Sequence, residues 1–166
     1  MSMKILLAAI ALLALAACAS FDGRGIPQGA SAAQVEAMMG PAADKRVHGD
    51  ETWVYYPRQP YGYANYVARF DSAGRLIAIE QRLTDENVAA IERGKTERAA
   101  VEELLGPPYK AWHFPRMPRD VLEYRMRVTS TSVPQGLYVQ ATPDGIVREV
   151  FIENDPDYRL SECCAR

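Results

Sequence analysis

A short apolar stripe at helical spacing occurs twice in the chain, 66 positions apart. Apolar residues at i, i+3 and i+4 form one face of an amphipathic helix. The stripe residues are Val35, Met38 and Met39 in the first segment and Val101, Leu104 and Leu105 in the second. The pattern therefore predicts two short helices that each bury one face.

Both predicted helices carry the same stop signal. Gly40 and Pro41 follow the first stripe, and Gly106 and Pro107 follow the second. A glycine just past a helix adopts the left-handed conformation readily, and a proline cannot continue the helix. The two stripes should therefore end at equivalent points.

The starts of the helices are marked by hydroxyl residues. Ser31 and Thr96 stand where the N-caps of the two stripes are expected, because their side chains can accept a hydrogen bond from a backbone N–H of the first turn. Between the stripes, a third helix is predicted over 85–93, capped by Thr84 and stopped by Gly94.

Strand-like runs follow each stripe, in the same order. The predicted strands are 51–57, 64–71 and 75–82 after the first, and 110–114, 121–128, 136–141 and 146–152 after the second. In each half the last two runs are separated by a turn sequence, Asp71 to Gly74 and Thr142 to Gly145. Chance similarity between two helix ends is the alternative, but it does not explain the repeated order of the strands.

The expected fold is therefore α+β, with two tandem units. Each unit consists of a short helix or helices followed by a three- to four-stranded antiparallel sheet. We expect the units at 28–83 and 84–155, with a tail at 156–166. A domain below about 70 residues rarely builds a sufficient core, so the two units should dock side by side.

The N-terminus reads as an export signal. Lys4 precedes an apolar run that ends in Leu15-Ala16-Ala17-Cys18, which resembles the bacterial lipobox. A transmembrane helix is the alternative, but a span needs about 20 apolar residues and this run is shorter. We therefore expect a cleaved signal peptide at 1–17, lipidation of Cys18 and a tether at 18–27.

Composition excludes some functions. The chain is 48% hydrophobic and 24% charged with a formal net charge of −2, which is typical of a globular protein and does not favour nucleic-acid binding. His48 and His113 are its only histidines, and no nucleophile, phosphate-loop or metal-ligand motif surrounds them. Cys163 and Cys164 are adjacent near the C-terminus. We expect a non-catalytic protein without a metal or cofactor.

The first unit resembles the outer-membrane assembly lipoproteins of the BamE/SmpA/OmlA type. That family has a helix ending in Leu-Gly-x-Pro, a Thr-Trp-x-Tyr strand, an Arg-Gln-rich loop and a Phe-x-x-x-Gly turn. The matching residues are Met39-Gly40-Pro41, Thr52-Trp53-Val54-Tyr55, Arg58-Gln59-Pro60 with Gly62, and Phe70 with Gly74. In the second unit, Leu122-Glu123-Tyr124 stands in place of Thr-Trp-x-Tyr.

The resemblance implies a lipid-anchored, non-catalytic accessory subunit of β-barrel assembly at the periplasmic face of the outer membrane. It also implies contacts with partner subunits and phosphatidylglycerol through the loop after the aromatic strand. That loop comprises Arg58, Gln59, Pro60, Tyr61, Gly62 and Tyr63. The short leader and the second unit depart from the family, so a related envelope lipoprotein with another client is an alternative.

A tandem pair of such units is also similar in architecture to secreted β-lactamase-inhibitor proteins, whose disulfides have no counterpart here. This similarity implies an inhibitor or ligand-binding module of the periplasm, which would use the concave surface between its two sheets. Co-purification with barrel-assembly subunits or with a soluble enzyme would distinguish the two hypotheses.

The chemistry of the loop permits an interface. The planar guanidinium of Arg58 suits phosphate or carboxylate, and tyrosines such as Tyr61 and Tyr63 give amphipathic contact area. The alternative is a hairpin whose tyrosines pack on their own sheet while Arg58 is solvated. The segment from His113 to Arg119 in the second unit is interpreted as a rigid exposed connection.

If the loop is an interface, Arg58→Glu should weaken binding to the partner or to anionic lipid and leave the fold intact. Pull-down and vesicle-binding assays on the variant check this expectation. Unchanged binding in both assays would remove the loop from the interface.

Overall fold

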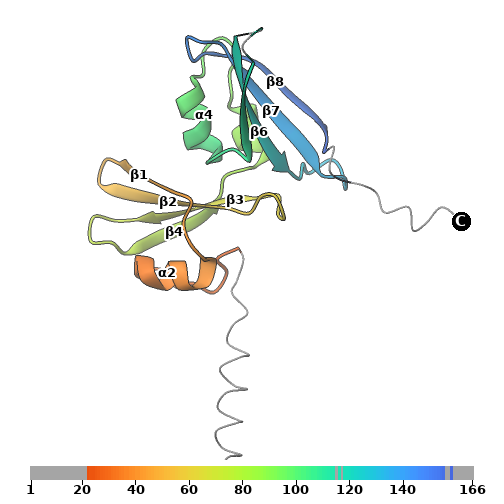
Figure 1. The fold of residues 1–166 in the computed structure, drawn as a ribbon. Coiled ribbons are helices and arrows are strands. Elements are labelled where there is room, and N and C mark those ends of the chain that lie inside the picture. Colours follow the sequence, from red (N-terminus) through yellow and green to blue (C-terminus); the bar gives the residue numbers. More distant parts are fainter. Residues whose placement is uncertain (1–21, 115, 117, 156–157, 159–166) are drawn as a thin grey trace, which may run out of the picture.

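The computed structural model describes residues 22–114, 116, 118–155 and 158. These residues form two antiparallel four-stranded sheets with short helices (Figure 1), as the predicted α+β class requires. In chain order the elements are α2 (Ala32–Met39), β1 (Asp44–His48), β2 (Glu51–Pro57), β3 (Asn65–Phe70), β4 (Leu76–Gln81), α3 (Asp85–Ala89), α4 (Arg98–Leu105), β5 (Lys110–Phe114), β6 (Arg119–Met126), β7 (Gln135–Ala141) and β8 (Val147–Asn154).

Both sheets are simple meanders, with strand orders β1-β2-β3-β4 and β5-β6-β7-β8. We predicted three strands for the first sheet, and the missing one is β1. Its sequence, Asp-Lys-Arg-Val-His, is polar, and its one aliphatic residue, Val47, is 73% exposed. Because β1 is an edge strand held by backbone pairing with β2, it carries no apolar pattern from which it could be predicted.

The repeated order of elements extends to fine geometry. An isolated β-bridge joins Ser31 to Arg75 in the first unit and Glu97 to Ile146 in the second. The pairing of the last two strands shifts register at Phe70 in one sheet and at Ala141 in the other. Both predicted hairpin turns are present as well, closed by glycines with positive φ at the end of each turn.

The two units align differently from the expected match of Leu122-Glu123-Tyr124 with the Thr-Trp-x-Tyr motif. The backbone N–H of Ala43 donates to the carbonyl of Tyr55, and the N–H of Tyr109 donates in the same way to the carbonyl of Glu123. Tyr55 therefore corresponds to Glu123. Tyr124 corresponds to Tyr56, not to the last residue of the Thr-Trp-x-Tyr motif.

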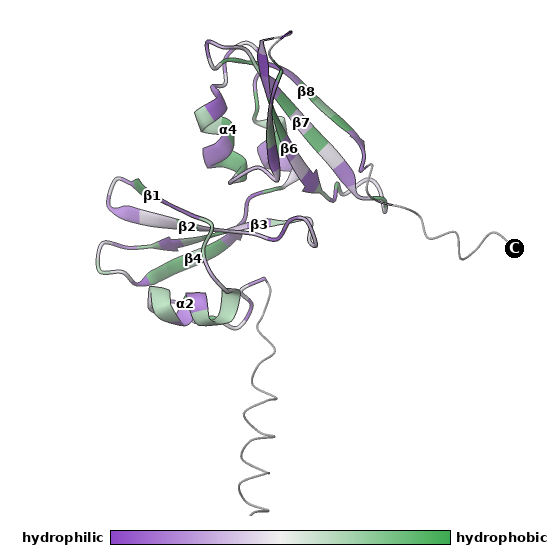
Figure 2. Cartoon of the chain, in the orientation of Figure 1, coloured by the Kyte–Doolittle hydropathy of each residue, from purple (hydrophilic) through white to green (hydrophobic). Residues whose placement is uncertain are grey.

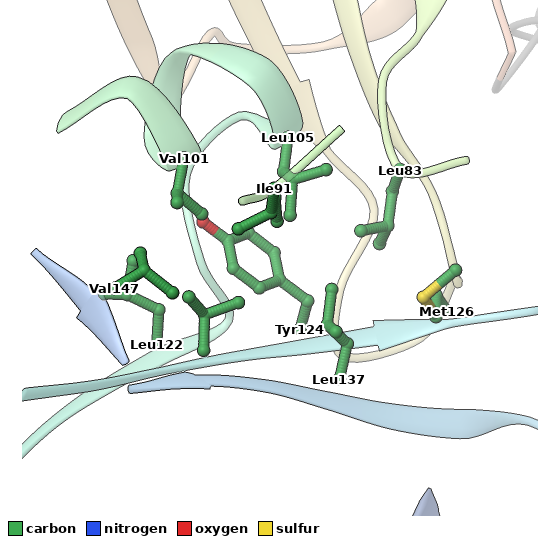
Figure 3. Close-up of a cluster of buried hydrophobic side chains, with 10 residues drawn as sticks. Leu83, Ile91, Val101, Leu105, Leu122, Tyr124, Met126, Leu137 and Val147 are labelled. Carbon is green, nitrogen blue, oxygen red and sulfur yellow. The ribbon is translucent and has the colours of Figure 1, made fainter. Parts of the chain in front are cut away.

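Each sheet buries the face that its helix covers. In the first unit α2 lies on one side of the sheet (Figures 1 and 2) and buries a small core. That core comprises Ala30, Val35, Met39, Val54, Tyr56, Ala68, Phe70 and Leu76. The second core is larger and lies between the sheet and helices α3 and α4 (Figure 3).

Tyr124 is at the centre of this second core. Its ring is fully buried and its hydroxyl donates to the carbonyl of Gly106. Burial raises the pKa of the Tyr124 hydroxyl well above its usual range, because an ionised phenol would lose its solvation there. Tyr124 therefore stays neutral and holds β6 to the end of α4.

The helix starts agree with the sequence in two of three cases. Ser31 forms a capping box with Gln34, and Thr84 accepts a hydrogen bond from the N–H of Asn87. The prediction for Thr96 was wrong, because Glu97 is the N-cap of α4 and makes no side-chain capping bond. Helix α3 is also shorter than predicted and ends at Ala89.

The helix stops are confirmed in position but not in conformation. Gly40 has φ +84° and ψ −174°, and Gly106 has φ +83° and ψ −175°. The positive φ explains why glycine is required. The extended ψ, in place of left-handed helical values, turns the chain directly toward the proline and the sheet.

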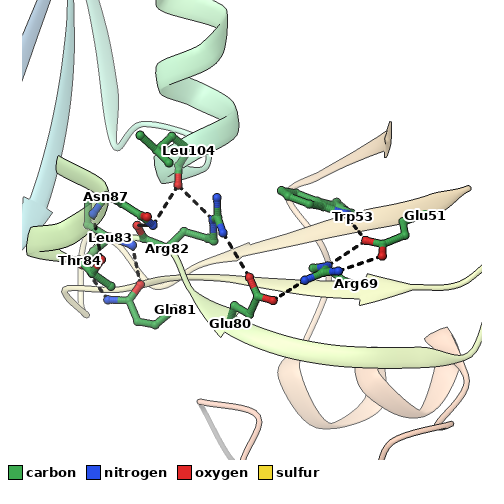
Figure 4. Close-up of polar contacts among 10 residues, drawn as sticks. All are labelled: Glu51, Trp53, Arg69, Glu80, Gln81, Arg82, Leu83, Thr84, Asn87 and Leu104. Atoms are coloured by element: carbon green, nitrogen blue, oxygen red, sulfur yellow. Dashed lines mark hydrogen bonds and ion pairs between the residues drawn. The ribbon is translucent and has the colours of Figure 1, made fainter. Parts of the chain in front are cut away.

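The second unit docks on the first at the end of α4. The side-chain amide of Asn65, fully buried, donates to the carbonyls of Leu105 at 2.8 Å and Pro107 at 2.9 Å. A Cβ at Gly106 would lie 3.2 Å from this amide nitrogen, so only glycine permits such a close approach. Beside it, Arg82 donates to the carbonyl of Leu104 at 3.1 Å (Figure 4).

The variant Asn65→Asp tests this dock. It preserves shape but replaces the donor with a carboxylate facing two carbonyls. We expect it to lower the free energy of unfolding by about 1–3 kcal/mol, the cost of an unsatisfied buried group. Denaturant titration measures this change. Asn154→Asp is the matched control, because the Asn154 side chain is exposed and, among the described residues, accepts one hydrogen bond and donates none. Equal effects of the two changes would contradict the role of Asn65.

Candidate functional site

The faces of the two sheets that point away from their own helices differ in character. On the first sheet this outer face is a charged network around Trp53 (Figure 4). The guanidinium groups of Arg69 and Arg82 lie 5.6 and 5.3 Å from the Trp53 ring. Helix α4 borders this face, since Ala100 and Leu104 line a cavity of about 210 Å³ together with Trp53. The second unit therefore partly covers the outer face of the first sheet.

Glu51 is the anion of this network. Arg69 donates to both of its oxygens at 2.8 Å, and the indole N–H of Trp53 donates at 2.9 Å. The bonds from Arg69 first, and from Trp53 second, lower the pKa of Glu51 to about 2. Within the described part of the chain, the charges of Glu51 and Arg69 are thus paired with each other, and the Trp53 indole adds a hydrogen bond.

The outer face of the second sheet is open. Side chains alternate along β6, so Leu122 and Tyr124 enter the core while Val121 and Glu123 point to the other side. A groove of about 480 Å³ lies over this side. Its lining residues are Lys110, Trp112, Phe114, Val121, Glu123, Tyr138, Gln140 and Phe151.

Aromatic side chains form the walls of this groove. Trp112 and Phe114 on the edge strand β5 are 43% and 46% exposed. Across the sheet, the rings of Tyr138 and Phe151 stack at 5.1 Å. Gly136 makes room for this pair, because a Cβ there would lie 2.9 Å from the Tyr138 ring. We call this feature the aromatic groove.

A line of alternating cations and rings joins the aromatic groove to the loop at 58–63. Each cation lies 4.7 to 5.7 Å from the centre of the ring beside it. In spatial order the line runs Arg127, Tyr63, Arg125, Tyr109, Lys110 and Trp112. A chain of side-chain contacts therefore links the groove to the loop and spans both units.

The loop itself is docked on the second unit. The Gln59 side chain accepts from the backbone N–H of Arg125 at 2.8 Å and donates to Asn65 at 3.1 Å. The carbonyl of Pro60 accepts from the Arg125 guanidinium, which also pairs with Asp155 at 2.6 Å. The side chains of Arg125 and Asp155 are only 9% and 2% exposed. This buried ion pair therefore orients the guanidinium that binds the loop at Pro60.

Arg58 has a structural role that the sequence did not indicate. Its guanidinium donates to the carbonyl of Met39 at the end of α2 and lies 5.9 Å from the rings of Tyr56 and Tyr66. Burial lowers the pKa of Arg58, and the side chain is not solvated as the alternative hypothesis supposed. Arg58→Glu should therefore also cost stability, so the expectation of an intact fold needs correction.

The other loop residues differ in exposure. Tyr61 is 94% exposed at the tip. The N–H of Gly62 donates to the carbonyl of Arg58 at 2.6 Å, and a Cβ at Gly62 would lie 2.8 Å from that of Arg58. Of the residues predicted to contact a partner, Tyr61 is therefore the most available, whereas Gln59, Pro60 and Tyr63 already contact the second unit.

The aromatic groove was missed in the sequence. Trp112 and Phe114 are two positions apart in a predicted strand, and this period of two could have assigned both to one face. The neighbouring His113 lies on the opposite face, where its ring contacts Asp120 at 2.8 Å, and Asp120 also pairs with Arg98. His113 and Asp120 therefore already have partners within their own unit.

Some predictions concern residues that the structure does not describe. Cys18, the signal at 1–17, and Cys163 and Cys164 lie outside the described residues. Among the residues that are described, no helix combines the length and apolar character needed to cross a bilayer. Lipidation of Cys18 therefore stays a prediction.

Comparisons with known proteins place few limits on the function. No family model and no curated protein matches the chain. A solved structure from Streptococcus mutans, of a protein proposed to be a β-lactamase inhibitor, matches with a TM-score of 0.29 and 15% identity. The match covers 87% of this chain and 94% of that one. This similarity is too low to carry an argument, and the resemblance to outer-membrane assembly lipoproteins remains a prediction from motifs.

The lowered pKa of Glu51 predicts a specific acid dependence. A carboxyl with a depressed pKa contributes stability above its unfolded pKa, about 4.3, and loses that contribution as the pH falls through the folded value. The stability difference between the natural chain and Glu51→Gln should be constant above about pH 5 and disappear near pH 2. Denaturant titrations across this range measure it. In an Arg69→Met background the pH dependence should be much smaller, and an undiminished one would contradict the assignment.

Proposed function

We propose that this chain is a non-catalytic, lipid-anchored protein-binding module of the bacterial periplasm. The lipid on Cys18 holds it at the outer membrane, and the aromatic groove receives a loop of a folded partner protein. The observation that carries the proposal is the exposure of Trp112 and Phe114 on an open sheet face beside the stacked pair of Tyr138 and Phe151. This is the kind of surface on which tryptophan and tyrosine contribute most of the binding energy.

The asymmetry between the two sheets supports this proposal. The first outer face is partly covered by α4 and its charged groups are paired. The second outer face has the same underlying strand order but carries aromatic walls and an open groove. Solvent-exposed apolar patches of this kind mark interaction sites in soluble proteins.

A second candidate is the accessory role in β-barrel assembly that the motifs imply, with contacts to assembly subunits and phosphatidylglycerol. The position of Asp22 favours it, because Asp22 lines a pocket of about 330 Å³ with Arg58, Tyr63 and Tyr66. A lipidated Cys18 would be four residues away, a reach of at most about 14 Å. The loop at 58–63 would then stay close to the headgroups.

Photo-crosslinking in intact cells tests the proposal. A photoreactive residue at position 114 should capture one periplasmic protein, and Trp112→Ala should reduce this capture at least tenfold. Val47→Ala is the matched control, since Val47 is exposed on the first sheet, and it should leave capture unchanged.

Besides the absence of any capture from position 114, three results would overturn the proposal. A crosslink to a second copy of the chain would make the groove a self-association surface. Capture of barrel-assembly subunits from position 61, with none from position 114, would favour the second candidate. Capture that is insensitive to Trp112→Ala would show that the groove is not the binding surface.

A further inference from the structure

We infer that the aromatic groove binds an arginine side chain of its partner, which pairs with Glu123 and stacks on Trp112. This inference rests on the proposed function and names the chemistry of the partner at the same site. It follows from a comparison of two similar tryptophan–glutamate pairs, one on each sheet.

On the first sheet, a cation binds the tryptophan–glutamate pair. The indole N–H of Trp53 donates to Glu51 at 2.9 Å. Arg69 binds both oxygens of this carboxylate and lies over the Trp53 ring. The carboxylate is thus neutralised by a bidentate cation, and the ring receives a cation–π contact from the same guanidinium.

The pair on the second sheet lacks the cation. The indole N–H of Trp112 donates to Glu123 at 3.0 Å, and this is the one polar contact of the Glu123 side chain among the residues that the structure describes. Yet Glu123 is only 7% exposed and lines the groove. The rest of the residue is covered by its own unit, and a largely buried carboxylate is stabilised when a cation pairs with it.

Lys110 does not fill this role. It lies directly across from Glu123 in the pairing of β5 with β6, but its ammonium is placed over the rings of Tyr109 and Trp112, at 4.7 and 5.4 Å. Within the described part of the chain, Lys110 forms no ion pair with a carboxylate. Its charge therefore competes with an incoming cation over Trp112 and weakens the field of Glu123 without pairing with it.

The groove has the size and walls for a guanidinium. Its volume of about 480 Å³ exceeds that of one side chain, and it is open at the surface for entry. Arginine stacks on aromatic faces and forks onto a carboxylate, whereas lysine is a compact and strongly hydrated charge. An arginine at the tip of a partner loop would reproduce the arrangement that Arg69 completes on the first sheet.

The test uses the full chain and two probes that differ only in charge. N-acetyl-arginine amide carries the guanidinium, and N-acetyl-citrulline amide carries a neutral group of the same shape. The nuclear magnetic resonance of the Trp112 indole N–H, identified by its loss in Trp112→Phe, reports occupancy of the groove. We expect the arginine probe to bind at least tenfold more tightly than the citrulline probe.

Variants assign this preference to Glu123. Glu123→Gln should remove it, while Lys110→Met should strengthen arginine binding several-fold by removing the competing charge. Glu149→Gln is the matched control, because Glu149 is an exposed carboxylate on the same face, and it should leave the preference intact. Equal binding of both probes, or a preference that survives Glu123→Gln, would overturn the inference.

The outcome is separable from that of the proposed function. If position 114 captures a partner whose binding is unaffected by Glu123→Gln, the proposed function stands and the arginine site is wrong. If the arginine probe binds as expected while position 114 captures no protein, the groove has its charge preference but the proposed function fails.

Discussion

The hydrogen bonds that the first unit donates to the end of α4 hold the molecule together. The last carbonyls of a helix have no partner within it, and each needs a donor from elsewhere. In the first unit Arg58 supplies one to Met39. The equivalent carbonyl in the second unit belongs to Leu105, and its donor is Asn65 of the first unit.

The second unit depends on the first for this helix cap because the two units differ at one position. Pairing of the strands places Met126 where the first unit has Arg58, because Arg58 pairs with Ala64 and Met126 with the corresponding Gln135. Met126 is fully buried in the second core and cannot cap a helix. The second unit therefore gains apolar packing and takes its helix cap from its neighbour.

These contacts between the units determine which surfaces stay exposed. It brings α4 against the first sheet and seats Gln59 and Pro60 on Arg125. The outer face of the second sheet is left open, and side-chain contacts through Arg125 link it to the loop that carries Tyr61. A module that uses the groove and the loop together needs both units, because the loop comes from one and the groove from the other.

Local patterns predicted much of the fold. Ser31, Gly40 and Gly74 act through neighbours in sequence, so caps, stops and turns could be identified from them. The edge strand β1 was missed because backbone pairing holds it without an apolar pattern. The roles of Gln59 and Asn65 were missed because their partners are 66 and 40 residues away, and no local rule connects residues so far apart.

We expect the contacts between α4 and the first unit to make the two units one rigid body. Residual dipolar couplings of backbone N–H bonds in the two sheets, measured on the full chain, report whether the sheets keep one relative orientation. A single alignment tensor should fit both sheets. Two tensors that differ in magnitude or orientation would show that the units move independently, and would contradict a binding surface shared between them.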